Sequence, residues 1–202
     1  MAVAHLMPEE AALDGVQPQA RQRAIAHVRQ GIQEAEQLGI ADVYVGPPTS
    51  DVGTSMAAYR ESILVLADQA LRVGVRLGIE HFPGRGLPTV RSTLDFIANV
   101  GHENLYLLLD IGHNQIAGES PRTSIAAAGD RLMYVHVNDN DGHNDTHVGL
   151  LEGVQDEDWL RDAVLAVIEA PYAGPISVEV NQSIPDPRAS AQKSLAILRR
   201  IE

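Results

Sequence analysis

The feature that most constrains the fold is a regular alternation between short apolar runs and longer amphipathic stretches. Near-continuous apolar runs are typical of strands buried in a parallel sheet, whereas apolar residues spaced three and four apart are typical of helices. The runs predict strands at 41–45, 75–80, 105–110, 132–136 and 176–179. The amphipathic stretches predict helices at 21–39, 55–73, 89–100, 121–128, 156–170 and 189–201. Strand–helix alternation with short connections predicts a parallel α/β fold.

Four of the apolar runs end in a residue type that binds metal ions. These residues are Glu80, Asp110, His136 and Glu179. A charged group at the end of a buried strand is costly unless something compensates it, and in a parallel barrel the carboxyl ends of the strands hold the catalytic groups. Each residue taken alone fits a buried polar group with a local partner equally well. All four together predict a hard, oxygen-rich site for Mn²⁺, Mg²⁺ or Co²⁺.

Two further signals lie outside the strands. His113 follows the predicted strand end at Asp110, in what the sequence predicts to be a turn loosened by Gly112, where it could reach the metal rim or a substrate hydroxyl. The long polar segment 138–156 contains Asp145 and His147, which are two residues apart and could converge on an ion or simply be solvated. The His and Asp content of this segment favours a functional loop over a linker.

Composition weighs against several classes of function. The chain of 202 residues has no cysteine, so it has neither disulfides nor a thiolate nucleophile, which favours a cytoplasmic protein. A formal net charge of −12 weighs against a nucleic-acid partner, because DNA and RNA binders usually carry a basic face. The first ten residues lack a signal-peptide pattern, and no apolar run is long enough to span a membrane.

Four sequence segments together resemble one known superfamily. They are the strand that ends in Glu80, LDIGHN (109–114), YVHVNDNDGHNDTH (134–147) and ISVEV (176–180). These segments are similar to the xylose-isomerase-like TIM-barrel proteins, which include sugar phosphate isomerases and epimerases. The resemblance covers roughly residue 21 to the C-terminus. It implies a (β/α)₈ barrel that hosts many different substrates.

The resemblance also implies roles for individual residues. The shared metal site of the epimerases corresponds to Glu80, Asp110, His136 and Glu179, and His113 corresponds to a residue that contacts substrate. Glu80 and Glu179 would also transfer protons from the two faces of the substrate. One divalent cation (Mn²⁺, Mg²⁺, Co²⁺ or Zn²⁺) would stabilise the enediolate that forms when a proton leaves the carbon next to a carbonyl. The expected activity is isomerisation or epimerisation of a sugar or sugar phosphate.

An alternative is the AP endonuclease branch of the same barrel, which uses three zinc ions. The Asp145–Thr146–His147 element matches that branch, and His5 sits where a further ligand would fall. The strand 41–45, however, ends in Gly46–Pro47 where that branch places a His. This departure and the acidic charge favour the isomerase reading.

Length sets the last expectation. A closed eight-stranded barrel usually needs about 250 residues. With a further strand in 1–7, residues 1–202 would form a single domain with about six of the eight strands, lacking the first βα units. Such a barrel has open edges, so a homo-oligomer that covers them is expected, and an inactive truncated barrel is a further alternative.

Overall fold

The computed structural model of the chain describes residues 11–201 and shows the expected strand–helix alternation. The strands are β1 (Asp42–Val45), β2 (Arg76–Glu80), β3 (Leu105–Asp110), β4 (Leu132–Val137) and β5 (Ile176–Val178), and they follow one another in the sheet in that order. The helices are α1 (Pro18–Gln37), α2 (Gly53–Arg72), α3 (Val90–Val100), α4 (Ile111–Ala117), α5 (Pro121–Ala128), α6 (Glu157–Glu169) and α7 (Pro187–Leu198), with a 3₁₀ turn at Gly129–Arg131. The predicted parallel α/β fold is confirmed, while the predicted strand at 1–7 lies outside the described residues.

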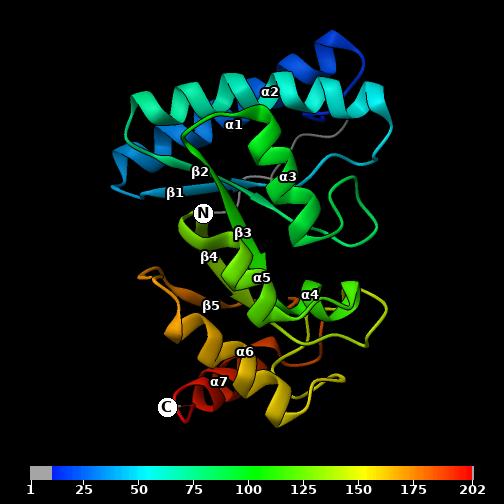
Figure 1. The fold of residues 1–202 in the computed structure, drawn as a ribbon, viewed down its shortest axis with the longest axis vertical. Coiled ribbons are helices and arrows are strands. Elements are labelled where there is room, and N and C mark those ends of the chain that lie inside the picture. The colour runs from blue at the N-terminus through cyan, green and yellow to red at the C-terminus, as the bar shows by residue number, and fades with distance from the viewer. Residues whose placement is uncertain (1–10, 202) are drawn as a thin grey trace. The chain divides into compact units, whose positions relative to one another are not determined.

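The chain divides into two compact units. The described part of the first comprises 11–88 and 92–108. In it β1, β2 and β3 pair in parallel, with Tyr44 opposite Gly78 and Ile79 opposite Leu107. Helices α1 and α2 lie side by side (Figure 1) and bury side chains such as Ile32 and Ile63. Burial of such apolar surface, at about 25 cal/mol per Å², supplies the main favourable free energy of folding here.

The second unit comprises 89–91 and the described residues from 109 onward. Its strands β4 and β5 pair in parallel, with His136 opposite Ser177. The Glu179 backbone N–H donates to the Val137 carbonyl at 3.1 Å, so this pairing continues one residue beyond β5. The backbone of Glu179, a candidate metal ligand, is therefore held by strand pairing and not by a free loop.

Helix α6 illustrates what the periodic pattern predicts well and where it is wrong. Asp156 caps the helix by accepting a hydrogen bond from the Trp159 N–H, as expected for an N-cap aspartate. Leu160 and Val167 are buried as their spacing predicts. The pattern also places Ile168 on the buried face, and this is wrong, because its side chain is 57% exposed. Ile168 follows Val167 directly, so it is rotated about 100° away from the buried face.

The segment after β3 differs from expectation. Instead of a loose turn around Gly112, the chain forms helix α4, which begins directly after the strand and ends at Gly118 with φ of 68°. Asp110 is the N-cap of this helix and accepts a hydrogen bond from the His113 N–H. His113 thus sits in the first turn of a helix, where its direction is fixed by helical geometry.

Within residues 11–201, the structure contains no helix that is both long and apolar enough to cross a membrane.

Candidate metal centre

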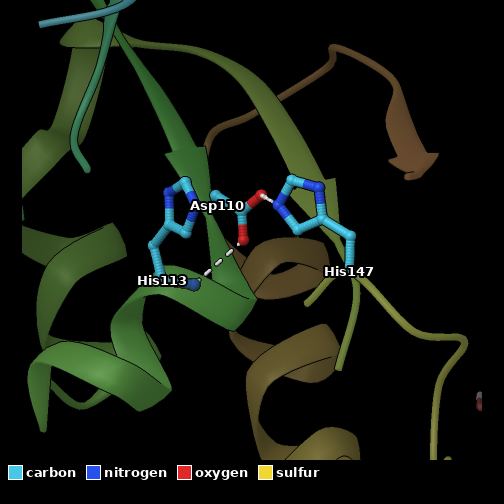
Figure 2. A group of neighbouring side chains, drawn as sticks. All are labelled: Asp110, His113 and His147. Carbon is cyan, nitrogen blue, oxygen red and sulfur yellow. Dashed lines mark hydrogen bonds and ion pairs between the residues drawn. The ribbon is translucent and has the colours of Figure 1, made fainter. Parts of the chain in front are cut away.

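Asp110 lies at the centre of the candidate site and has no exposed surface. Its Oδ1 accepts a hydrogen bond from the His113 N–H at 3.0 Å (Figure 2), and its Oδ2 accepts one from the Asn138 side-chain amide at 2.7 Å. Both carboxylate oxygens are therefore oriented by neighbours. A carboxylate oriented in this way can still offer its remaining lone pairs to a cation.

His136 and Glu179 meet beside Asp110. His136 lies on β4, and Glu179 directly follows β5. The Nδ1 atom of His136 lies 2.7 Å from Glu179 Oε2 and 3.9 Å from Asp110 Oδ2. Ligand atoms of these three residues all lie within 4.8 Å of one another, which is the spacing expected around one ion. The second unit alone thus brings three of the four predicted ligands together.

A second group adjoins the first through Asp110. His147 Nε2 lies 3.9 Å from Asp110 Oδ2 (Figure 2) and 2.8 Å from Asp145 Oδ1. Asp145 Oδ1 is also 3.2 Å from His113 Nε2, and the rings of His113 and His147 stack at 5.7 Å. The predicted convergence of Asp145 and His147 is present in the structure, and His113 joins them.

Charge complementarity keeps the carboxylates ionised. Burial by itself would raise the pKa of Asp110, but the neighbouring His113, His136 and His147 outweigh it and lower that pKa. Burial also opposes ionisation of Glu179, and contact with His136 again lowers its pKa below the ordinary value. For His147, the desolvation that lowers its pKa is outweighed by Asp145, Asp110 and Glu179, which raise it. The acids are thus in the form that binds cations.

The buried donor atoms fit a divalent cation. Glu179 Oε2 and His147 Nε2 are both buried and make no hydrogen bond of acceptable geometry within the described part of the chain, although each has an ion-pair partner closer than 3 Å. In each of these two pairs a carboxylate oxygen faces an imidazole nitrogen, and the pair is costly to bury unless a proton or a cation lies between the two atoms. Carboxylate oxygens with imidazole nitrogens suit Mn²⁺, Co²⁺, Mg²⁺ or Zn²⁺.

Glu80 belongs to the other unit. It is the last residue of β2, is 4% exposed, and lies in register with Leu108 of β3. Its role as the fourth ligand stays a prediction.

Sequence reasoning missed two asparagines that support the site. Asn138 directly follows β4, Asn140 lies two residues further along the chain, and neither has exposed surface. Fully buried side-chain amides need specific partners, but nothing in a linear polar run such as 138–145 shows which of its residues are buried. By contrast, His143 in the same run is exposed, as expected for a solvated residue.

The fold and this group of side chains define a class of protein. The family model described as "Xylose isomerase-like TIM barrel" matches residues 2–201, and the chain belongs to that family.

Several curated proteins resemble the chain. An L-ribulose 3-epimerase of Methylomonas sp. (strain DH-1) is 30% identical over 151 residues, which cover 73% of this chain and 49% of that protein. An inosose dehydratase of Lacticaseibacillus casei is 28% identical over 132 residues, covering 58% of this chain and 44% of the dehydratase. The chain therefore spans about half the length of these relatives.

Solved structures share the fold over nearly the whole chain. A D-tagatose 3-epimerase-like protein superposes with a TM-score of 0.80 at 22% identity, covering 96% of this chain and 75% of its own. The IOLI protein, solved with a zinc atom bound, superposes with a TM-score of 0.74 at 19% identity, covering 95% of this chain and 72% of its own. The strands of this chain thus correspond to part of a TIM-type barrel, as predicted.

Proposed function

We propose that the chain is a divalent-metal-dependent isomerase or epimerase of a sugar or sugar phosphate. The observation that carries the proposal is the convergence of Asp110, His136 and Glu179 within 4.8 Å of one another at the ends of β3, β4 and β5. The curated relatives include L-ribulose 3-epimerase and fructoselysine 3-epimerase, so the family context favours proton transfer on a sugar.

Glu80 is proposed as the fourth ligand. It is a buried carboxylate at the end of a strand, the position at which the resemblance to the epimerases places a metal ligand.

The two glutamates would share the proton transfers. A bound cation would stabilise the negative charge that develops on substrate oxygens as the enediolate forms. Glu179 combines a lowered pKa with a side chain that is 27% exposed, so it is ionised and reachable by substrate. It would remove the proton next to the carbonyl, and Glu80 would return one from the opposite face. General acid–base catalysis of this kind typically contributes about 10²- to 10⁴-fold in rate.

His113 is proposed to support the substrate side of the site. Its ring is buried, stacks on His147, and approaches Asp145 through Nε2. An imidazole held between an aspartate and a second ring has a defined direction. In this role, His113 would contact a substrate hydroxyl beside Asp110.

A second ion is a distinct alternative. Asp110, His113 and His147 offer ligand atoms within 4.8 Å of one another, and Asp145 lies against both histidines. Occupancy of both groups would favour a phosphodiesterase like the AP endonucleases over a one-metal isomerase. The net charge of −12 disfavours a nucleic-acid substrate.

The test combines metal analysis with solvent exchange. The purified chain is dialysed and its metal content measured by elemental analysis, for wild type and for Glu179→Gln. We expect about one tightly held ion per chain in the wild type and a marked loss in the variant, since one charged ligand is removed. The protein is then incubated with D-allulose, D-tagatose or L-ribulose in D₂O. We expect metal-dependent incorporation of deuterium at the carbon next to the carbonyl, which NMR detects.

Each outcome separates the candidates. Absence of metal from wild-type protein would defeat the proposed site. Two or three zinc ions, with cleavage of an abasic-site duplex, would establish the phosphodiesterase instead. If the same incubations are repeated with the phosphate esters of these ketoses, a bound ion without deuterium incorporation into any of the ketoses or their phosphates would refute the isomerase proposal.

A further inference from the structure

Two buried amides link the polar loop to the candidate metal ligand. Asn138 donates from Nδ2 to Asp110 Oδ2 at 2.7 Å, and its own Oδ1 accepts from Asn140 Nδ2 at 3.0 Å. Asn140 Oδ1 in turn accepts from the backbone N–H groups of Thr146 and His147 at 2.7 and 3.0 Å. A continuous series of hydrogen bonds therefore runs from the backbone at His147 to the carboxylate of Asp110.

The loop end of this series holds an unusual backbone. His147 has φ of 46°, in the left-handed region that residues other than glycine seldom adopt. Such conformations persist where surrounding contacts fix them. The bond from the His147 N–H to Asn140 Oδ1 is one such contact, and in this conformation Nε2 of His147 faces Asp110 Oδ2 at 3.9 Å.

The other end is shaped by a glycine. A Cβ atom added at Gly112 would lie 1.8 Å from Asn138 Oδ1 and 2.5 Å from Asn140 Nδ2. Gly112 lies inside helix α4, where alanine would otherwise be favoured by about 1 kcal/mol. The space for the amide pair, rather than the helix, is what requires a glycine here.

We propose that Asn138 and Asn140 are positioning residues that set the metal affinity of the site, with Gly112 providing the room they need. The pair fixes one oxygen of Asp110 and, through the same hydrogen bonds, the backbone that directs His147. This inference rests on the proposed function only in requiring that the Asp110 group binds a cation. Hydrogen-bond partners of metal ligands typically contribute about 10- to 100-fold to metal affinity.

Each side-chain amide has one donor end and one acceptor end, so a substitution that keeps the size of the side chain but removes the donor can test this role. In Asn140→Asp, the oxygen that accepts from Thr146 and His147 remains, but the donor to Asn138 Oδ1 is lost. Asn138 would have to turn its own donor toward residue 140, which would take it away from Asp110. Gly112→Ala adds a methyl group that overlaps the two side chains, and so displaces them without changing either asparagine.

The measurement is calorimetric titration of metal-stripped protein with Co²⁺ alone, together with the visible absorption spectrum of the cobalt-loaded protein. We expect Asn140→Asp and Gly112→Ala each to weaken Co²⁺ binding by about 10- to 100-fold and to alter the spectrum, at temperatures well below unfolding. The control is Asn144→Asp, which makes the same change of charge on an exposed side chain whose amide donates to Asp141 in the same turn.

The results distinguish this inference from the proposed function. If wild type fails to bind Co²⁺, the proposed function is lost. If wild type binds and a folded Asn140→Asp or Gly112→Ala protein binds within about twofold of it with the same spectrum, the positioning role is wrong. If Asn144→Asp weakens binding as much as Asn140→Asp, the effect is one of charge and the positioning role is equally wrong. Circular dichroism of the stripped proteins establishes which variants fold, and one folded variant of the two is sufficient.

Discussion

At the scale of single residues, Asp14 shows how a buried charge is stabilised away from the candidate site. It is 7% exposed, and its Oδ2 accepts hydrogen bonds from the Thr49 N–H, the Thr49 hydroxyl and the Ser55 hydroxyl. Burial raises its pKa, but these donors outweigh burial and lower the pKa below the ordinary value. This carboxylate ties the segment before α1 to the start of α2.

We expect Asp14→Asn to destabilise the protein by about 1–2 kcal/mol at pH 7, because hydrogen bonds to a charged acceptor become bonds to a neutral one. A group whose pKa is depressed on folding stabilises the protein above its unfolded pKa, about 3.9, and that contribution is lost as the pH falls through the folded pKa. The difference between wild type and variant in urea unfolding should therefore shrink below about pH 4. Asp51→Asn, at an exposed position nearby, is the control, and an equal loss in both variants would contradict the assignment.

At the scale of elements, the segment between β4 and α6 is an ordered loop. The Asp139 carboxylate accepts backbone hydrogen bonds from Gly153, Val154 and Gln155 at 2.8 to 3.3 Å. The far side of the loop is attached to α7, where the Leu150 N–H donates to the Ser194 hydroxyl at 2.9 Å. A segment that is polar in sequence thus behaves as a packed element.

Asp139→Asn should loosen this loop, while the backbone amides in the rest of the chain stay protected from hydrogen exchange. The substitution replaces one carboxylate oxygen by an amide donor that faces backbone N–H groups, and each hydrogen bond lost to a charged acceptor is worth about 1.5–3 kcal/mol. Hydrogen exchange followed by mass spectrometry should show faster exchange across 140–155. Asp141→Asn is the matched control, because that side chain is exposed and accepts its hydrogen bonds from His143 and Asn144 in the same turn. Unchanged exchange in Asp139→Asn would show that the carboxylate does not hold the loop.

The elements also show how far sequence alone reaches. Helix α5 begins and ends where its pattern predicts, and the strands agree to within a residue or two, because apolar periodicity reports directly on which face is buried. Helix α4 is missed because its signal is a capping aspartate at a strand end, which is easily taken for a strand residue alone. The start of α7 at Pro187 is two residues earlier than expected, although proline in a first turn after Asp186 is a known start signal.

The residues of the candidate site likewise include some that the sequence predicts and some that it does not. Asp110, His136 and Glu179 are predictable because strand ends in a parallel sheet meet at one edge. Asn138 and Asn140 are not predictable, since their importance depends on which atoms they face, and that is set by the path of the loop. Gly112 belongs with them, because the sequence suggests freedom of a turn there whereas the structure requires the absence of a Cβ.

At the scale of the whole molecule, metal binding should be visible as stability. A ligand that binds only the folded state at 100 times its Kd adds about 2.7 kcal/mol to the free energy of unfolding. We therefore expect Mn²⁺ or Co²⁺ to raise the Tm of metal-stripped protein by several degrees in thermal scans, and EDTA to reverse the rise. Glu179→Gln should show a much smaller rise. Equal rises in wild type and variant would mean that the ion binds elsewhere on this acidic chain.

The closure of the loop by Asp139 has a consequence for the thermodynamics of ligand capture. A long flexible segment that must be fixed when a ligand arrives loses conformational entropy at that moment, and the loss weakens binding. Here the residues between Asp139 and Gln155 are already held at both ends, and Asn140 fixes the stretch at Thr146 and His147. The entropy of ordering this segment is lost during folding, so a ligand that reaches Asp145 and His147 meets a surface that is already arranged.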